Sequence, residues 1–120
     1  MRTTSSVLLF VVSLVFVPKL AIAGNATDME MLAKADAIVA KAKGAGLDEL
    51  ARLADELDPI VAAKGLSQPC HKILDGMQSV LRIESYKETY AGMTDDVKKA
   101  IRDARDVGMA EDRKACIDAK

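Results

Sequence analysis

Residues 69–92 read PCHKILDGMQSVLRIESYKETYAG and hold the only histidine, both tyrosines and one of the two cysteines of the 120-residue chain. Pro69 suits the first turn of a helix, where a missing amide costs little, and Gly92 suits a helix end. We therefore predict a central helix over residues 69–91. At 100° per residue, one face of this helix carries Cys70, Ile73, Leu74, Met77, Val80 and Leu81.

A second apolar stripe lies on roughly the opposite face of the same stretch and consists of Ile83, Tyr86 and Tyr90. A helix with two apolar faces needs two neighbours, since a stripe that bears tyrosines seldom faces water without reason. The first face is expected to pack on the body of the domain. The second face has two interpretations: packing against another helix of the chain, or binding of a partner by Ile83, Tyr86 and Tyr90.

The rest of the chain repeats its apolar residues with helical rather than alternating periodicity, which predicts an all-α fold. We expect a small bundle of four to five helices that forms a single domain over residues 24–120. The expected helices cover about 28–43, 47–64, 69–91, 95–107 and 109–118.

Two local patterns determine the expected course of the first two helices. Thr27 and Glu30 have the spacing of a capping box, in which each side chain satisfies an exposed amide at the start of the first helix. The apolar phase continues across Pro59, so one kinked helix is expected over residues 47–64. A break with Asp58 as a new cap is the alternative.

The C-terminal segment is expected to form two helices. Thr94 is placed to cap the first of them, and Gly108 separates them, because the apolar phase slips at that glycine. The second helix is expected to turn away and bring Cys116 to the start of the central helix. The expected buried face of the first consists of Val97, Ala100, Ile101, Ala104 and Val107.

Residues 1–23 fit a secretory signal peptide. Arg2 supplies a positive start, residues 7–17 are apolar apart from one serine, and Ala21-Ile22-Ala23 fits the small-x-small pattern before a cleavage site. The apolar run of 11 residues is far shorter than the roughly 20 that cross a bilayer, so we expect cleavage and no permanent membrane anchor. The expected location is therefore secreted or periplasmic.

The two cysteines of an exported chain are most simply paired. A bridge between Cys70 and Cys116 would close a loop of 47 residues and contribute roughly 4 kcal/mol. Phe10 and Phe16 both lie in the expected signal peptide, so the rest of the chain must build its core without Phe or Trp. The bridge would then be a large share of a total stability of about 5 to 15 kcal/mol. An intermolecular bridge or free thiols are the alternatives.

The charge balance excludes an electrostatic nucleic-acid binder. The chain has 17 basic and 18 acidic residues, and removal of Arg2 and Lys19 with the signal leaves 15 basic against 18 acidic, a net charge of −3. Acids and bases alternate along the chain, so no basic patch is available for phosphates. We expect no nucleic-acid partner.

Candidate chemistry is sparse. His71 and Asp75 are one helical turn apart and could supply two metal ligands, but a tetrahedral site needs more, and a bridged Cys70 cannot coordinate. We interpret His71 as an exposed residue hydrogen-bonded to Asp75. Adjacent carboxylates such as Asp95 and Asp96 project apart on a helix. We therefore expect no catalytic, cofactor-binding or metal-binding residues, and no enzyme activity.

These observations favour an exported helical binding or adaptor protein. It would present its tyrosine-bearing helix face to an unidentified protein partner or to a second copy of itself. Two alternatives stay open: a helical carrier of a small hydrophobic ligand or a metal, and a secreted effector or immunity-type protein.

Overall fold

The computed structural model describes residues 26–119, which contain helices and no strand, so the all-α prediction is confirmed. The predicted signal peptide and its cleavage site lie outside the described residues. The helices are α2 (Ala26–Ala40), α3 (Leu47–Glu56), α4 (Asp58–Val61), α5 (Gln68–Ser85) and α6 (Asp95–Asp118).

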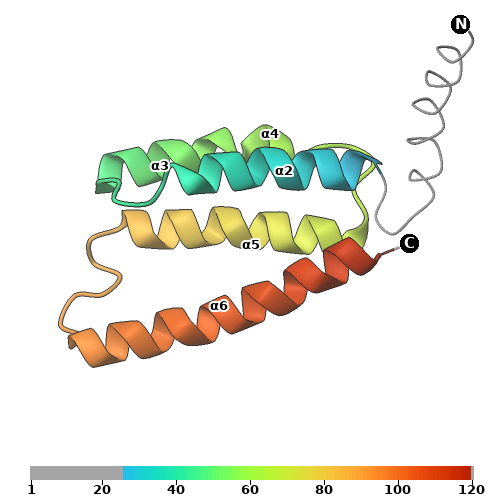
Figure 1. The fold of residues 1–120 in the computed structure, drawn as a ribbon. Coiled ribbons are helices and arrows are strands. Elements are labelled where there is room, and N and C mark those ends of the chain that lie inside the picture. Colours follow the sequence, from blue (N-terminus) through green and yellow to red (C-terminus); the bar gives the residue numbers. More distant parts are fainter. Residues whose placement is uncertain (1–25, 120) are drawn as a thin grey trace, which may run out of the picture.

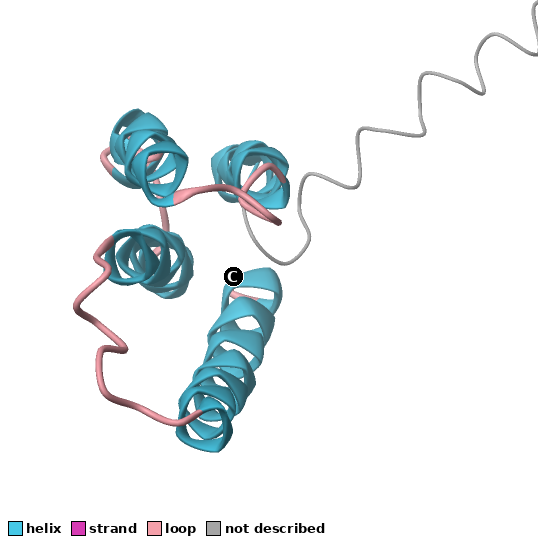
Figure 2. Ribbon diagram, turned by 90° about the vertical axis from the view of Figure 1, so that its left-hand side faces the viewer, coloured by secondary structure: helices cyan, strands magenta, loops and turns pink. Residues whose placement is uncertain are grey.

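The helices run alternately up and down, with α5 in the middle (Figure 1). α2 and α3 lie side by side on one flank of α5, and α6 lies on the other flank. α6 meets α5 near its own C-terminus and diverges from it toward its N-terminus. Seen along the bundle in Figure 2, α6 is inclined to the other helices. The bundle therefore has one closed end and one open end, where the turns 41–46 and 86–94 lie.

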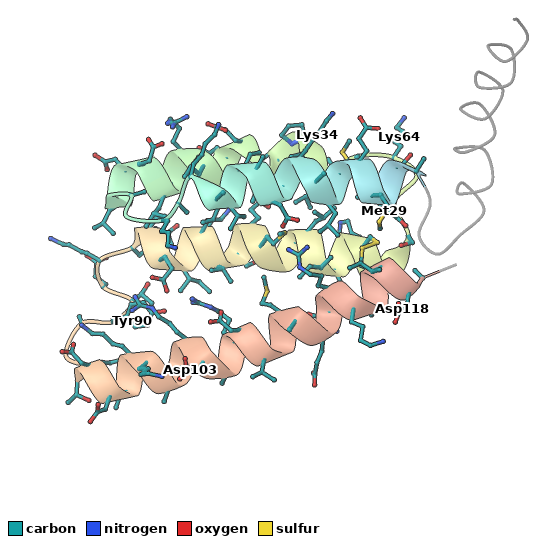
Figure 3. The ribbon with its side chains drawn as sticks, in the orientation of Figure 1. Met29, Lys34, Lys64, Tyr90, Asp103 and Asp118 are labelled. Carbon is teal, nitrogen blue, oxygen red and sulfur yellow. A yellow bond between two sulfur atoms is a disulfide. The ribbon has the colours of Figure 1, made fainter. Side chains whose placement is uncertain are left out.

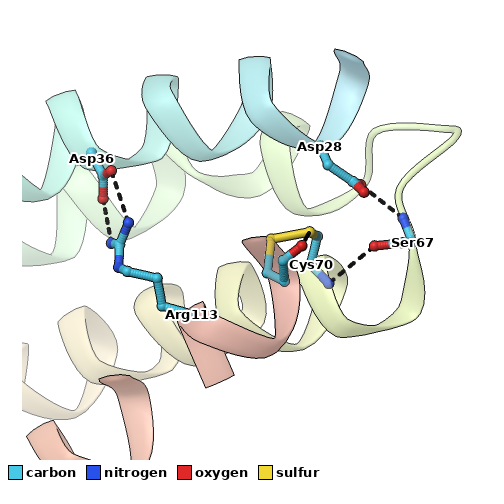
Figure 4. Close-up of a disulfide and its surroundings, with 6 residues drawn as sticks. Asp28, Asp36, Ser67, Cys70 and Arg113 are labelled. Carbon is cyan, nitrogen blue, oxygen red and sulfur yellow. Dashed lines mark hydrogen bonds and ion pairs between the residues drawn. A yellow bond between two sulfur atoms is a disulfide. The ribbon is translucent and has the colours of Figure 1, made fainter. Parts of the chain in front are cut away.

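The closed end is held by the predicted disulfide, which joins Cys70 at the start of α5 to Cys116 in the last turn of α6 (Figure 4). Both cysteines are fully buried. They belong to a core of short aliphatic and sulfur-containing side chains, as the composition predicts. The core consists of Leu32, Ala35, Leu53, Ala54, Leu57, Ile60, Cys70, Ile73, Leu74, Met77, Leu81 and Cys116.

The start of α2 differs from the predicted capping box. α2 already includes Thr27, and the Glu30 carboxylate pairs with Lys34 one turn later, so this box does not form. Asp28 is instead fully buried, and its Oδ1 accepts a hydrogen bond of 2.8 Å from the amide of Ser67 (Figure 4). Ser67 in turn caps α5 by accepting from the amide of Cys70. The Asp28 carboxylate thus supports the start of another helix, a long-range contact that local spacing does not reveal.

The predicted kinked helix over residues 47–64 is two helices, α3 and α4, separated at Leu57. The prediction of a single helix was wrong because Pro59 has no amide to continue the ladder. The alternative prediction, a break in the helix, is confirmed. The N-cap of α4 is Leu57, however, and not Asp58. Leu57 keeps a helical backbone and full burial, so the apolar phase continues across the break as predicted.

α5 is shorter than the predicted helix over residues 69–91, because it ends at Ser85. Tyr86 has an extended backbone, and its amide donates to the carbonyl of Ile83 at 3.3 Å. The Thr89 hydroxyl donates a second hydrogen bond, of 2.7 Å, to the same carbonyl at the end of the helix. The turn that follows brings the Tyr90 hydroxyl to the Glu84 carboxylate. In an unbroken helix these two residues would lie about 120° apart around the axis and about 9 Å apart along it, so the contact requires the helix to end.

α6 is a single helix of 24 residues that passes through Gly108, so the prediction of two helices was wrong. Thr94 caps it as predicted, accepting from the amide of Val97. The predicted buried stripe at residues 97–107 is exposed. The side that faces the bundle carries residues spaced by three or four positions, namely Arg102, Arg105, Met109, Arg113 and Cys116. The change of apolar phase at Gly108 therefore does not separate two helices. The apolar residues before it lie on the outward face of α6, whereas Met109 and Cys116 after it lie on the face toward the bundle.

Candidate binding surfaces

Large exposed apolar side chains concentrate near the open end. Five of the eight among residues 26–119 belong to the last turn of α5, the turn 86–94 and the first two turns of α6, and these are Ile83, Tyr86, Met93, Val97 and Ile101. Exposed apolar residues that gather in one region are typical of binding surfaces, whereas scattered ones are ordinary.

The three residues of the predicted tyrosine face do not share one helix face, because α5 ends before two of them. Ile83 and Tyr86 are 43% and 62% exposed. Tyr90 is half-buried and lies between the end of α5 and the start of α6 (Figure 3). Tyr90 therefore fits the packing interpretation, while Ile83 and Tyr86 are accessible to a partner.

Tyr90 belongs to an ionic cluster that braces the open end. Its hydroxyl donates to the Glu84 carboxylate on α5, and the guanidinium of Arg102 on α6 lies 4.5 Å from the centre of its ring. Arg102 also donates to both Glu84 oxygens, at 2.8 and 3.3 Å, and Nη1 of Arg105 donates to Glu84 at 3.0 Å. One carboxylate thus ties α5 to α6 and to the turn between them.

The electrostatics of this cluster keep Glu84 ionised. Burial raises the pKa of Glu84, but hydrogen bonds from Arg102, Tyr90 and Arg105 outweigh that effect and lower the pKa from 4.5 to about 2. Arg102 responds in the opposite direction, since its hydrogen bond to Glu84 raises its own pKa. The cluster is therefore a charge network at neutral pH, with Glu84 ionised.

The outward side of α6 carries what we call the outer stripe, which consists of Val97, Ala100, Ile101, Ala104 and Val107. Its three larger side chains, Val97, Ile101 and Val107, are 46%, 40% and 62% exposed. Their spacing follows one helix face over about three turns. Such a regular apolar stripe on the solvent side of a helix is the pattern of a surface that packs on something.

A groove runs between α2 and α6, with α5 at its base. Two adjoining cavities of about 1030 and 350 Å³ form it, and both are lined by Val39, Val80, Arg105 and Asp106. The smaller cavity also reaches Arg113, whose guanidinium pairs with Asp36 at 2.6 and 3.1 Å and so links α6 to α2 (Figure 4). We call these joined cavities the central groove.

The sequence did not single out the basic residues of the central groove. The bundle side of α6 carries Arg102, Arg105 and Arg113. No continuous apolar stripe marks this side in the sequence. Their helical spacing with Met109 and Cys116 could have indicated which side of α6 faces the bundle. Cys116 had to face α5 for the disulfide to form, and residues on the same helix face as Cys116 must face the bundle too.

The closed end places His71 and Asp75 at the rim of a separate cavity of about 450 Å³, together with Lys72 and Asp112. His71 is exposed, and Lys72 pairs with Asp112 at 3.4 Å. Among residues 26–119, no three His, Cys, Asp or Glu side chains gather closely enough to hold a metal ion. Within the same range, no helix has the length and apolar character needed to span a membrane.

Comparison of this chain with protein-family models, with curated proteins and with solved structures finds no match. Its function must therefore be argued from its own surfaces.

Proposed function

We propose that this chain is an exported, non-catalytic helical protein that binds an amphipathic helix of another protein along the outer stripe of α6. The supporting observation is the exposure of Val97, Ile101 and Val107 at helical spacing on one face. Ala100 and Ala104 lie between them and keep this face shallow. A second helix can approach a shallow apolar strip closely and bury most of it.

Ile83 and Tyr86 extend the proposed surface at the open end. Both are exposed and lie next to the turn that leads into α6. Tyrosine supplies a large contact area at a low cost in side-chain entropy, which suits the rim of an interface. Tyr90 is not part of this surface, because its ring and hydroxyl already contact Arg102 and Glu84.

Export is supported by the disulfide between Cys70 and Cys116, since such bridges persist in oxidising compartments and are rare in the cytosol. A secreted or periplasmic location is compatible with this bridge and with the predicted signal peptide. Measuring the mass of the processed protein from its source would locate the cleavage site and show the bridge together.

The test compares wild type with Ile101→Asp by native mass spectrometry of the protein purified from the organism that makes it. We expect wild type in a complex and the variant alone, with both melting at the same temperature, because Ile101 is 40% exposed. Lys99→Ser is the matched control, since Lys99 is exposed on the same helix but off the stripe. A wild-type monomer, or a complex that Ile101→Asp leaves intact, would contradict the proposal. A homodimer lost in Ile101→Asp would make a second copy the partner instead.

A second candidate function is that of a carrier for a small hydrophobic ligand. The observation in its favour is the central groove, whose larger cavity has about the volume of small-molecule binding sites. The same native mass spectra separate the two functions, because a carrier retains a small bound mass and an adaptor retains a protein.

A further inference from the structure

We propose that the central groove binds an unbranched aliphatic carboxylate, such as a fatty acid, with its chain along α5 and its carboxylate on Arg105. The inference rests on the carrier function proposed above and specifies the ligand. It uses residues that are separate from the outer stripe, so protein binding and ligand binding can be tested independently.

The lining of the groove favours an aliphatic chain. Its apolar residues come from α2, α3, α5 and α6, and they include Val39, Leu50, Ile73, Val80, Leu81 and Met109. None of the described residues that line the groove is aromatic. Flat aromatic ligands usually stack on aromatic side chains, whereas a flexible chain needs only a continuous aliphatic surface. The two adjoining cavities provide such a surface from the open end to the Asp36–Arg113 ion pair.

The charges along the groove favour an anion. Four basic residues line it, namely Lys43, Arg102, Arg105 and Arg113, against the two acids Glu84 and Asp106. The whole chain has a net charge of −1, so this excess of positive charge is local. An anionic head group gains from such an excess in a partly enclosed groove.

Arg105 is the residue best placed to receive that head group, because it lines both cavities. Its Nη1 donates to Glu84 and to the hydroxyl of Tyr90, at 3.0 and 3.3 Å. Its Nε is buried, and among residues 26–119 it is the one buried side-chain nitrogen or oxygen without a hydrogen-bond partner. A buried donor without a partner is unfavourable, so a shift of the Arg105 side chain that exposes Nε to a carboxylate oxygen in the groove would be compensated by a new hydrogen bond.

The neighbouring acids favour a monoanionic carboxylate over a phosphate. Glu84 accepts from Arg105 on one side, and Asp106 lines the same two cavities. Two of the other basic residues are already paired, Arg102 with Glu84 and Arg113 with Asp36. One guanidinium edge pairs with both oxygens of a carboxylate, whereas a phosphate would have a third oxygen and close to a second negative charge left over beside Glu84 and Asp106.

The test measures binding of dodecanoate, dodecanol and dodecyl phosphate to the oxidised protein by titration calorimetry, each below its micellar concentration. We expect dodecanoate to bind about tenfold more tightly than dodecanol, from one charge-assisted pair in a partly enclosed site. Arg105→Gln should remove this difference and leave dodecanol binding unchanged. Val80→Trp, which fills the groove, should weaken all three ligands.

A direct readout in the wild-type protein avoids any effect of Arg105→Gln on folding. The ¹⁵N-resolved resonance of the Arg105 Nε–H should shift on addition of dodecanoate and stay in place with dodecanol. If dodecanoate and dodecanol bind equally, the carboxylate site is overturned while the carrier function stands. If dodecyl phosphate binds most tightly, the choice of a carboxylate is overturned. If none of the three binds, both the ligand class and the carrier function fail.

Discussion

The substitution Glu84→Gln tests whether one carboxylate braces the open end of the bundle. Glu84 accepts hydrogen bonds from two arginines of α6 and from Tyr90, and its side chain is only 19% exposed. Glutamine keeps the shape and one acceptor oxygen but loses the charge. Arg102 and Arg105 would then lose the carboxylate that neutralises them.

The expected loss follows from the pKa of Glu84, which falls from 4.5 to about 2 in the folded protein. Each unit is worth about 1.36 kcal/mol, which gives roughly 3 kcal/mol at neutral pH. Arg102 is 43% exposed, so solvent screens part of its contribution, and we expect about 2 kcal/mol. Because the folded pKa is the lower one, this stability is complete above pH 4.5 and is lost as the pH falls toward 2.

Urea denaturation followed by far-ultraviolet circular dichroism, repeated at several pH values from neutral to about 2, measures this loss. Between neutral pH and about pH 2, the free energy of unfolding should fall by about 2 kcal/mol more in wild type than in Glu84→Gln. The unfolding free energies of the two proteins should therefore converge near pH 2. Glu88→Gln is the matched control, because Glu88 is an exposed glutamate four residues further along. Parallel pH profiles for wild type and Glu84→Gln would refute the role assigned to this carboxylate.

Three further predictions use the same denaturation assay. Cys70→Ala combined with Cys116→Ala should cost about 4 kcal/mol, because the bridge closes a loop with a sequence separation of 46, and reduction of wild type should cost about the same. Tyr90→Phe should cost about 1 kcal/mol through its lost hydroxyl, while Tyr86→Ala should stay within about 0.5 kcal/mol because Tyr86 is largely exposed. Asp36→Asn should cost less than about 1 kcal/mol, since its ion pair with α6 is solvent-exposed; a larger loss would show that this pair sets the position of α6.

Much of the fold could be predicted because it depends on local or unavoidable pairings. The core face of α5 was predicted from helical periodicity, and the five members of it that are fully buried are Cys70, Ile73, Leu74, Met77 and Leu81. The disulfide followed from there being only two cysteines. The Thr94 cap followed from side-chain chemistry at the start of α6.

Two of the errors occurred where a distant residue supplied the partner. A local capping box was predicted from Thr27 and Glu30, but the carboxylate that matters at this helix start is that of Asp28, which accepts from the amide of Ser67 at the start of α5. α5 was extended to residue 91, but the chain turns at Tyr86 and brings Tyr90 back to Glu84. Helical periodicity carries no information about such contacts, because they depend on which helices are neighbours.

The candidate surfaces were only partly foreseeable. Ile83 and Tyr86 were named from the sequence and are exposed, but the outer stripe was expected in the core. The carrier alternative implied a ligand site between helices, but the residues of the central groove were not predicted. Its arginines were not singled out from the sequence, and the structure places Arg102 and Arg105 against Glu84 and Arg113 against Asp36.

The sequence by itself determined the all-α class, the core face of α5, the Thr94 cap and the pairing of the two cysteines, because each depends on periodicity, capping or cysteine count. Only the tertiary structure decided which side of α6 faces the bundle. Once Cys116 is bound to Cys70, that side is the one bearing Arg102 and Arg105, whose aliphatic stems can lie along the groove while Glu84 neutralises their charges. The apolar side of α6, with Val97 and Ile101, is thereby turned outward.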